Sequence, residues 1–139
     1  MAINSQSGAI DWVWNGPSGP YNAIGSQERQ IAGVVKNGVL YQPVPTLPGI
    51  VAFDGDNGRV LWRFRTWAPV KMSPVVVDKH LIFGDTGGIL YSVSTQGTLT
   101  HTMTFLKPFF SSAPIVSGTS MIIANDRSIY SIPLGPLLK

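Results

Sequence analysis

The segment from Asp54 to Gly58, with the sequence DGDNG, is the part of the chain that most resembles a metal site. It places oxygen ligands at alternate positions and ends on glycine, as the first half of a calcium-binding loop does. A complete EF-hand loop also needs a glutamate six residues after that glycine, and Phe64 stands there. Asp, Asn and Gly are also the residues that β-turns prefer, so we expect a turn and no metal site.

The two histidines, His80 and His101, are the other residues with catalytic potential. Neither has a carboxylate or serine at the spacing of a recognised motif, and no Gly-x-Ser-x-Gly, His-Glu-x-x-His or phosphate-loop pattern occurs. The chain has no cysteine, which removes disulfides, thiolate ligands and a cysteine nucleophile. We therefore expect no catalytic, metal-binding or cofactor-binding residue in this chain.

Composition predicts a globular protein, because 44% of the 139 residues are hydrophobic and 12% are charged. The net charge is +3, and the basic residues are scattered except for Arg63 and Arg65, so no binding to nucleic acid is expected. No apolar segment has membrane-spanning length. The first residues also lack the basic and apolar regions of a signal peptide, so we expect none in this chain.

The elements that must position any site are short strands. Fifteen glycines and eleven prolines divide the chain into short runs rich in Val, Ile, Tyr, Phe and Trp, a pattern typical of an all-β protein. One motif recurs in register over residues 2–12 and 52–62: a small residue, an apolar residue, Asp or Asn, three further residues, Gly, and Trp four positions later. Residues 92–101 repeat it with His101 at the tryptophan position, and a further copy begins at Ser131.

A second motif lies between these copies. Residues 73–84, SPVVVDKHLIFG, match residues 113–124, APIVSGTSMIIA, position for position, and residues 32–41 are a looser version. Each predicts two apolar strands joined by a tight turn, with Asn37-Gly38 as the strongest hairpin signal. Equivalent positions lie 50, 40 and 39 residues apart, at Ala2, Ala52, Ser92 and Ser131. A period near forty with four short strands is typical of a propeller blade.

Physical chemistry assigns a structural role to the repeated residues. The glycines are expected at positive φ in the turn between the two outer strands, and the Asp or Asn before them is expected to accept backbone N–H groups. The tryptophans offer flat surfaces suited to docking on the next blade. The structural repeat residues are Gly8, Trp12, Asp54, Gly58, Trp62, Pro74, Gly97 and Pro114.

Together these motifs resemble the repeat of the PQQ-like, or quinoprotein alcohol dehydrogenase-like, β-propeller family. Residues 49–91 match the repeat most fully, at Ala52, Asp54, Gly58, Trp62, Ser73, Pro74, Phe83, Gly84, Gly88, Leu90 and Tyr91. The first copy lacks the Ser-Pro pair and the third lacks the tryptophan. The resemblance implies an all-β fold and extends over nearly the whole chain.

The strand pattern predicts a partial propeller. We expect about three four-stranded blades plus one strand, with repeat units at approximately 1–48, 49–87 and 88–127 and a final strand at 128–133. Closed propellers usually have four to eight blades. We therefore expect either a fragment of a longer protein, which is the simpler explanation, or a subunit that completes its ring by oligomerisation. In the second case, the last strand of one copy would pair with the first outer strand of another to give six blades.

Loops between blades provide the candidate binding surface, because propellers carry binding groups on these rims. Three loops, at residues 15–30, 66–71 and 107–110, are aromatic and mildly basic and could meet on one face. The candidate rim residues are Tyr21, Asn22, Arg29, Trp67, Lys71, Lys107, Phe109 and Phe110. The alternative is that the aromatic residues pack beneath their loops, and the sequence leaves both interpretations open.

The resemblance implies two alternative functions. Non-enzymatic members of the family include outer-membrane assembly lipoproteins and extracellular repeat proteins, which implies a binding or assembly scaffold with a protein partner and an exported parent. The alternative is part of a PQQ- and calcium-dependent quinoprotein dehydrogenase whose active-site residues lie outside this segment. Glu28 is the only glutamate and cysteine is absent, so no residue here can be matched to that active site.

Overall fold

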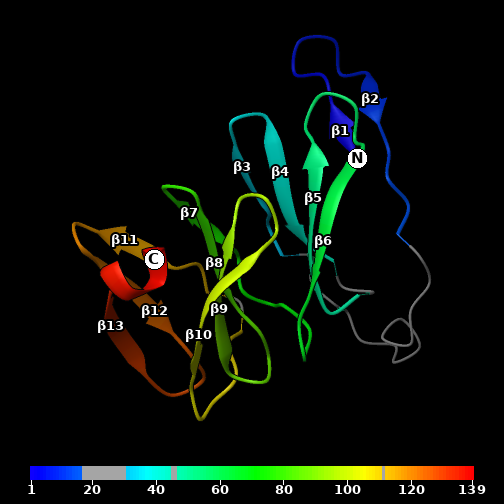
Figure 1. Ribbon diagram of the computed structural model, residues 1–139. Coiled ribbons are helices and arrows are strands. Elements are labelled where there is room, and N and C mark those ends of the chain that lie inside the picture. Colours follow the sequence, from blue (N-terminus) through cyan, green and yellow to red (C-terminus); the bar gives the residue numbers. More distant parts are fainter. Residues whose placement is uncertain (17–30, 45–46, 111) are drawn as a thin grey trace.

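The computed structural model describes residues 1–16, 31–44, 47–110 and 112–139. These residues form thirteen strands and a short 3₁₀ helix, arranged as successive antiparallel sheets (Figure 1). The predicted all-β class and partial propeller are confirmed.

Each sheet is formed by strands that are consecutive in the chain. The N-terminal hairpin contains β1 (Ala2–Ile3) and β2 (Ile10–Trp12). The first sheet contains β3 (Val34–Lys36), β4 (Val39–Pro43), β5 (Gly49–Asp54) and β6 (Val60–Arg65). The second sheet contains β7 (Val75–Val77), β8 (His80–Gly84), β9 (Ile89–Ser94) and β10 (Leu99–Thr104). The third sheet contains β11 (Ile115–Ser117), β12 (Ser120–Ala124) and β13 (Ile129–Pro133), and η2 (Gly135–Leu138) follows it.

The thirteen strands are divided unequally among the four sheets. In the described residues the first and second sheets are complete four-stranded blades, the third sheet lacks an outer strand, and the N-terminal hairpin corresponds to the two outer strands of a blade. Each repeat unit in the sequence therefore combines the outer hairpin of one sheet with the inner hairpin of the next.

The turn chemistry explains the hairpins. Asn37 and Gly38 have φ values of 50° and 74°, which the tight turn between β3 and β4 requires. In the turn between β5 and β6, the Asp54 carboxylate accepts the backbone N–H of Asp56 at 2.9 Å and Gly58 has a φ of 73°. The candidate calcium segment is this turn.

The core lies between the sheets. Tyr41 and Ala52 of the first sheet pack against Leu81 and Phe83 of the second. The opposite face of the second sheet packs on the third through residues that are at most 5% exposed: Ile82, Leu90, Met121, Ile123 and Ile132. Each side of the second sheet is therefore apolar and covered, and the three sheets pack as successive layers.

Two tryptophans link successive sheets at one end. The Trp12 indole N–H donates to the Gly55 carbonyl oxygen at 3.0 Å, and the Trp62 indole N–H donates to the Thr95 carbonyl oxygen at 3.0 Å. Each ring covers the glycine of the next turn so closely that a Cβ atom on Gly97 would lie 2.9 Å from the Trp62 ring. These glycines thus provide both a positive φ and the space for an indole.

The chain leaves the repeat after Leu134. The Leu134 N–H donates to the Thr119 carbonyl oxygen, as the equivalent Gly55 and Thr95 N–H groups donate to the preceding turns. Instead of a turn and a fourth strand, η2 follows and buries Leu137 completely against the core between the second and third sheets. The Ser92 hydroxyl donates to the Leu137 carbonyl oxygen at 2.6 Å and fixes this segment.

We predict that Gly97→Ala destabilises the protein more than Gly118→Ala. Both glycines have positive φ, 92° and 57°, but a Cβ at Gly118 has no atom within 4 Å whereas a Cβ at Gly97 meets the Trp62 ring. Backbone strain costs Gly118→Ala about 1 kcal/mol, and crowding should add about 1–3 kcal/mol for Gly97→Ala. Urea unfolding of both variants measures the difference, and equal losses would contradict the docking role of Trp62.

Candidate binding rim

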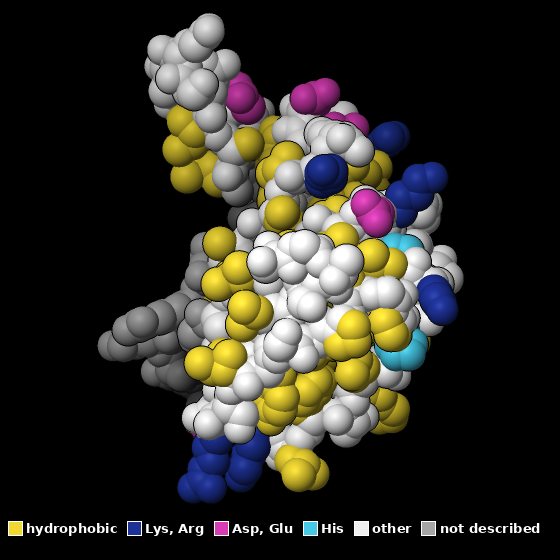
Figure 2. Space-filling model, turned by 90° about the vertical axis from the view of Figure 1, so that its left-hand side faces the viewer, with side chains coloured by type: hydrophobic (Ala, Val, Ile, Leu, Met, Phe, Trp, Pro, Cys, Tyr) yellow, Lys and Arg dark blue, Asp and Glu magenta, His cyan; other side chains and the backbone are white. Residues whose placement is uncertain are grey.

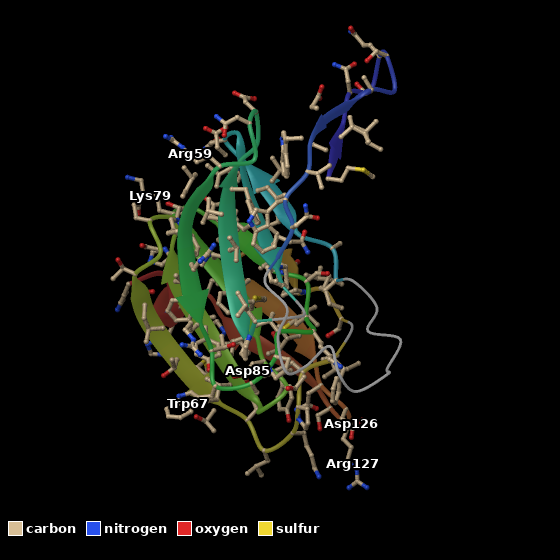
Figure 3. The ribbon with its side chains drawn as sticks, turned by 90° about the vertical axis from the view of Figure 1, so that its right-hand side faces the viewer. Arg59, Trp67, Lys79, Asp85, Asp126 and Arg127 are labelled. Atoms are coloured by element: carbon tan, nitrogen blue, oxygen red, sulfur yellow. The ribbon has the colours of Figure 1, made fainter. Side chains whose placement is uncertain are left out.

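The loops after the outer strands and the turns between the second and third strands of the sheets lie at the same end of the molecule. Figure 3 shows Trp67, Asp85, Asp126 and Arg127 at this end and Arg59 and Lys79 at the opposite end. We use the term rim for residues 66–71, 85–88, 105–110 and 125–128. The β6–β7 and β10–β11 loops thus meet the β8–β9 and β12–β13 turns, as expected for a propeller face.

The rim presents apolar side chains to solvent. Trp67 is 87% exposed, Leu106 is 97% exposed and Phe110 is 44% exposed. Lys107 is also exposed, and Lys71 is half-buried. Leu106 was missed by sequence reasoning, although its place next to Lys107-Pro108 in a blade-connecting loop was a usable signal. The rim is therefore a mixed surface of exposed apolar and basic side chains, with one exposed carboxylate at Asp126.

Phe109 lies beneath the rim and not on it. Its side chain is fully buried, and its ring contacts the Phe105 ring edge-on at a centroid distance of 5.1 Å. The ring also packs against Gly84, where an added Cβ would lie only 2.5 Å from it. Of the aromatic candidates that the structure describes, Phe109 therefore supports its loop, while Trp67 and Phe110 are available to a partner.

A buried carboxylate organises the rim. Asp85 has no exposed surface, and its Oδ1 accepts the N–H groups of Gly87 and Ile89 at 2.9 and 3.0 Å. Its Oδ2 accepts the Tyr91 hydroxyl at 2.8 Å. The Tyr91 oxygen in turn accepts the Trp67 N–H at 3.4 Å, which connects the carboxylate to the neighbouring loop.

Backbone hydrogen bonds join the same segments. The Phe109 N–H donates to the Asp85 carbonyl oxygen at 3.2 Å, and the Thr86 N–H donates to the Pro69 carbonyl oxygen at 2.9 Å. The turn carrying Asp85 therefore contacts both blade-connecting loops. Sequence reasoning matched Tyr91 to the repeat but missed Asp85, whose place directly after Phe-Gly was the available signal.

The third sheet repeats this arrangement with an amide. Ile123 lies opposite Tyr130, as Phe83 lies opposite Tyr91, so Asn125 takes the place of Asp85. The Asn125 Oδ1 accepts the N–H groups of Arg127 and Ser128 at 3.2 and 3.0 Å, and its Nδ2 donates to the Tyr130 hydroxyl at 3.3 Å. The rim turns are thus shaped by one recurring side-chain network.

Burial raises the pKa of the Tyr91 hydroxyl, and the hydrogen bond to Asp85 raises it further. Tyr91 therefore remains a neutral donor well above neutral pH. Because Asp85 is completely buried and its oxygens are occupied by three donors, the pair shapes the loops and offers no exposed base to a substrate.

The remaining candidate residues are dispersed. Tyr21, Asn22 and Arg29 lie outside the described residues. His80 begins β8, and its buried Nδ1 has no hydrogen-bond partner among the described residues, while His101 lies on β10. Within the described ranges, no group of three or more His, Cys, Asp or Glu side chains could hold a metal ion, and no helix is long and apolar enough to cross a membrane.

The fold is that of PQQ-like β-propeller proteins. BamB from Moraxella catarrhalis superposes with a TM-score of 0.63 at 15% identity, over 73% of this chain and 32% of that protein. A quinohemoprotein alcohol dehydrogenase from Pseudomonas putida HK5 gives a TM-score of 0.61 at 19% identity, over 69% of this chain and 16% of that protein. The corresponding enzyme from Comamonas testosteroni gives 0.61 at 17% identity, over 69% and 17%.

These similarities concern the fold. The chain spans between 16 and 32% of the length of these three proteins. No protein-family model matches the chain, and no curated protein is similar to it. The family resemblance read from the repeats is confirmed at the level of architecture.

We predict that Tyr91→Phe lowers the free energy of unfolding by about 1–3 kcal/mol, because it removes a donor from a buried carboxylate. Tyr130→Phe is the matched control, since the Tyr130 hydroxyl contacts a neutral amide at 3.3 Å, and it should cost about 1 kcal/mol or less. Denaturant unfolding at pH 7 measures both variants. Equal losses of unfolding free energy would show that the Tyr91 hydroxyl does not stabilise the buried Asp85 carboxylate.

The same variant should change the dependence of stability on pH. The pKa of Tyr91 is raised above its ordinary 10.0 in the folded state, so folding favours the protonated form. Its contribution to stability is complete below pH 10 and declines as the pH rises above 10 towards the folded-state pKa. The difference between the wild type and Tyr91→Phe should therefore shrink above pH 10. A constant difference would contradict a buried, protonated Tyr91.

Proposed function

We propose that this chain is a section of a PQQ-like β-propeller that acts as a non-catalytic binding or assembly scaffold. Its two outer sheet faces are covered by further blades, from a longer parent chain or from a second copy, and its rim binds a protein partner. The family resemblance supports an exported protein.

The exposure of equivalent apolar residues carries this proposal. Ile82 and Leu90 of the second sheet are completely buried because the third sheet covers them. Their equivalents by strand register, Ile122 and Ile129, are 39% and 78% exposed. A face that repeats the buried pattern of its neighbour supports a further blade on the third sheet.

The first sheet supports the same conclusion at the other end. Leu81 is completely buried against the first sheet, whereas its equivalent Leu40 is only partly buried. Val35, which pairs with Leu40, is 64% exposed. In the described residues, Trp12 and Trp14 cover this face by contacting Phe53, and Leu40 is packed against the same cluster but remains partly exposed. The inner strands of a preceding blade would cover the remainder.

The rim supports binding to a protein. Trp67, Leu106 and Phe110 present apolar surface, and Lys107 beside them adds positive charge. Tryptophan and other aromatic residues are enriched at the centres of protein interfaces. Because the Asp85 network holds the loops in place, little further ordering would be needed on binding.

We predict that Trp67→Ala weakens binding of the rim partner at least tenfold, since interface tryptophans commonly contribute more than about 1.4 kcal/mol. Leu99→Ala is the control, because Leu99 is also exposed, at 48%, but lies on an outer strand away from the rim. The partner is first identified by cross-linking and mass spectrometry, and its affinity for each variant is then measured by interferometry. Equal affinities for both variants would place the interface elsewhere.

The alternative is a section of a quinoprotein dehydrogenase, whose other blades would hold PQQ and calcium. The two functions are distinguished in the full-length parent, because under either proposal the chain alone would lack the cofactor site. The parent is titrated with PQQ in the presence of calcium while tryptophan fluorescence and the reduction of a dye in the presence of alcohol are followed. We expect neither saturable quenching nor dye reduction. Saturable PQQ binding that depends on calcium would contradict the non-catalytic scaffold and support the dehydrogenase.

A further inference from the structure

We propose that two copies of this chain close into one ring, in which β2 of each copy becomes the outer strand of the other copy's third sheet. This inference rests on the proposed scaffold function and specifies a second copy as the cover for both open faces.

The third sheet has an open edge. In the first and second sheets, β5 and β9 pair with the outer strands β6 and β10. The equivalent strand β13 pairs with β12 on one side and with no other described strand, since η2 turns away to pack on the second sheet. An unpaired strand edge is a template for an added strand.

The N-terminal hairpin lacks the inner strands of a blade. Its β2 carries Trp12, which docks on the first sheet as Trp62 docks on the second, so β2 is an outer strand. Its only described partner is β1, which is two residues long. Ile10 of β2 and Val13, just after this strand, are 60% and 54% exposed. The third sheet therefore has the first three strands of a blade and lacks the fourth, whereas β2 is a fourth strand whose described partner is only β1.

The repeat fixes the register of the proposed pairing. Trp62 lies opposite Ala52 and His101 lies opposite Ser92, so Trp12 of the second copy would lie opposite Ser131. Three residues further along, Arg65 pairs with Gly49 and Thr104 pairs with Ile89.

The same offset places Asn15 of the second copy opposite Ser128. Both residues are exposed, so the pairing can be tested without disturbing the core. In this arrangement β13 takes the place of the two-residue strand β1, which must leave β2.

The two open faces also match. On the third sheet, Ile115 and Ile122 lie opposite each other and share their face with Ile129. They would cover Val35 and Leu40 of the second copy, as the equivalent Val75, Ile82 and Leu90 cover the inner part of the third sheet.

The third-sheet face carries no charge that would oppose this contact, and the two arginines on the facing side of the first sheet, Arg63 and Arg65, lie on its outer strand β6 and are exposed. The remaining residues of the third-sheet face, by strand alternation, are Ser117, Ser120, Ala124, Ser131 and Pro133. Figure 2 looks onto this side of the molecule, where hydrophobic and uncharged side chains occupy the middle and charged side chains lie towards the margins. No charged residue of the face would be buried, which would otherwise cost free energy.

The count of blades permits closure. Each copy supplies two complete sheets and a third that the other copy completes, so two copies give about six blades, within the four to eight of known propellers. The two junctions are identical and related by a two-fold axis, so that no open edge remains.

Light scattering coupled to size-exclusion chromatography tests the ring. We expect a discrete species of twice the chain mass of 15.0 kDa that persists on dilution. Ile122→Lys should convert it to the monomer, whereas Leu106→Lys should not, because Leu106 is exposed on the rim, away from both faces. Circular dichroism checks that both variants are folded.

Cross-linking tests the register. The chain has no cysteine, so Asn15→Cys and Ser128→Cys introduce the only thiols. Refolding the two variants together under mild oxidation should give a disulfide-linked heterodimer, because a disulfide requires the two Cα atoms to lie within about 7 Å of each other, as on paired strands. Asn57→Cys, exposed in the turn at the opposite end from the rim, replaces Asn15→Cys as the control and should give none.

The outcomes separate the two proposals. A monomer at all concentrations, a dimer that survives Ile122→Lys, or equal cross-linking by the Asn57→Cys control would overturn the ring. None of these would affect the scaffold, which a longer parent could complete and which the rim and PQQ experiments test independently.

Discussion

Burial of both faces of each sheet is the constraint on which this structure depends. The second sheet satisfies it, because the first sheet covers Leu81 and Phe83 and the third covers Ile82 and Leu90. A sheet that is apolar on both sides cannot be stable in water alone, so each sheet requires a neighbour on each side. The chain meets this requirement internally once and leaves it open at both ends.

The indole contacts add orientation to this general apolar packing. Hydrophobic burial is non-directional, whereas the hydrogen bonds from Trp12 and Trp62 to the next turn fix how one sheet lies on another. Where His101 replaces the tryptophan, η2 supplies a different contact through Ser92 and Leu137. The junction between the second and third sheets is therefore stabilised by η2, which is not part of the repeat.

In the rim, a buried polar network fixes the position of a surface loop. Asp85 is hidden, but its hydrogen bonds connect the turn to Tyr91 and, through it, to the backbone of Trp67. Holding the loop backbone leaves the Trp67 side chain exposed while its position is maintained. A rigid loop that presents an aromatic side chain loses less conformational entropy on binding than a flexible one.

The sequence by itself determined the strands, turns and repeat, because these depend on local chemistry. Asn37-Gly38 favours one tight turn, the Asp54 to Gly58 segment favours another, and the recurring tryptophan motif gives a period near forty residues. Only the tertiary structure decided what each loop side chain does. Phe109 and Phe110 are adjacent and chemically identical, yet one is fully buried against Gly84 and the other is exposed.

The same limit applies to Asp85 and to the open faces. The position of Asp85 after Phe-Gly marks it as part of the repeat, but its burial depends on donors from Gly87, Ile89 and Tyr91, which only the folded chain brings together. Leu90 and Ile129 have similar side chains at equivalent positions, and only the presence or absence of a neighbouring sheet makes one buried and the other exposed. Local sequence specifies which residues can be buried, and long-range packing decides which of them are.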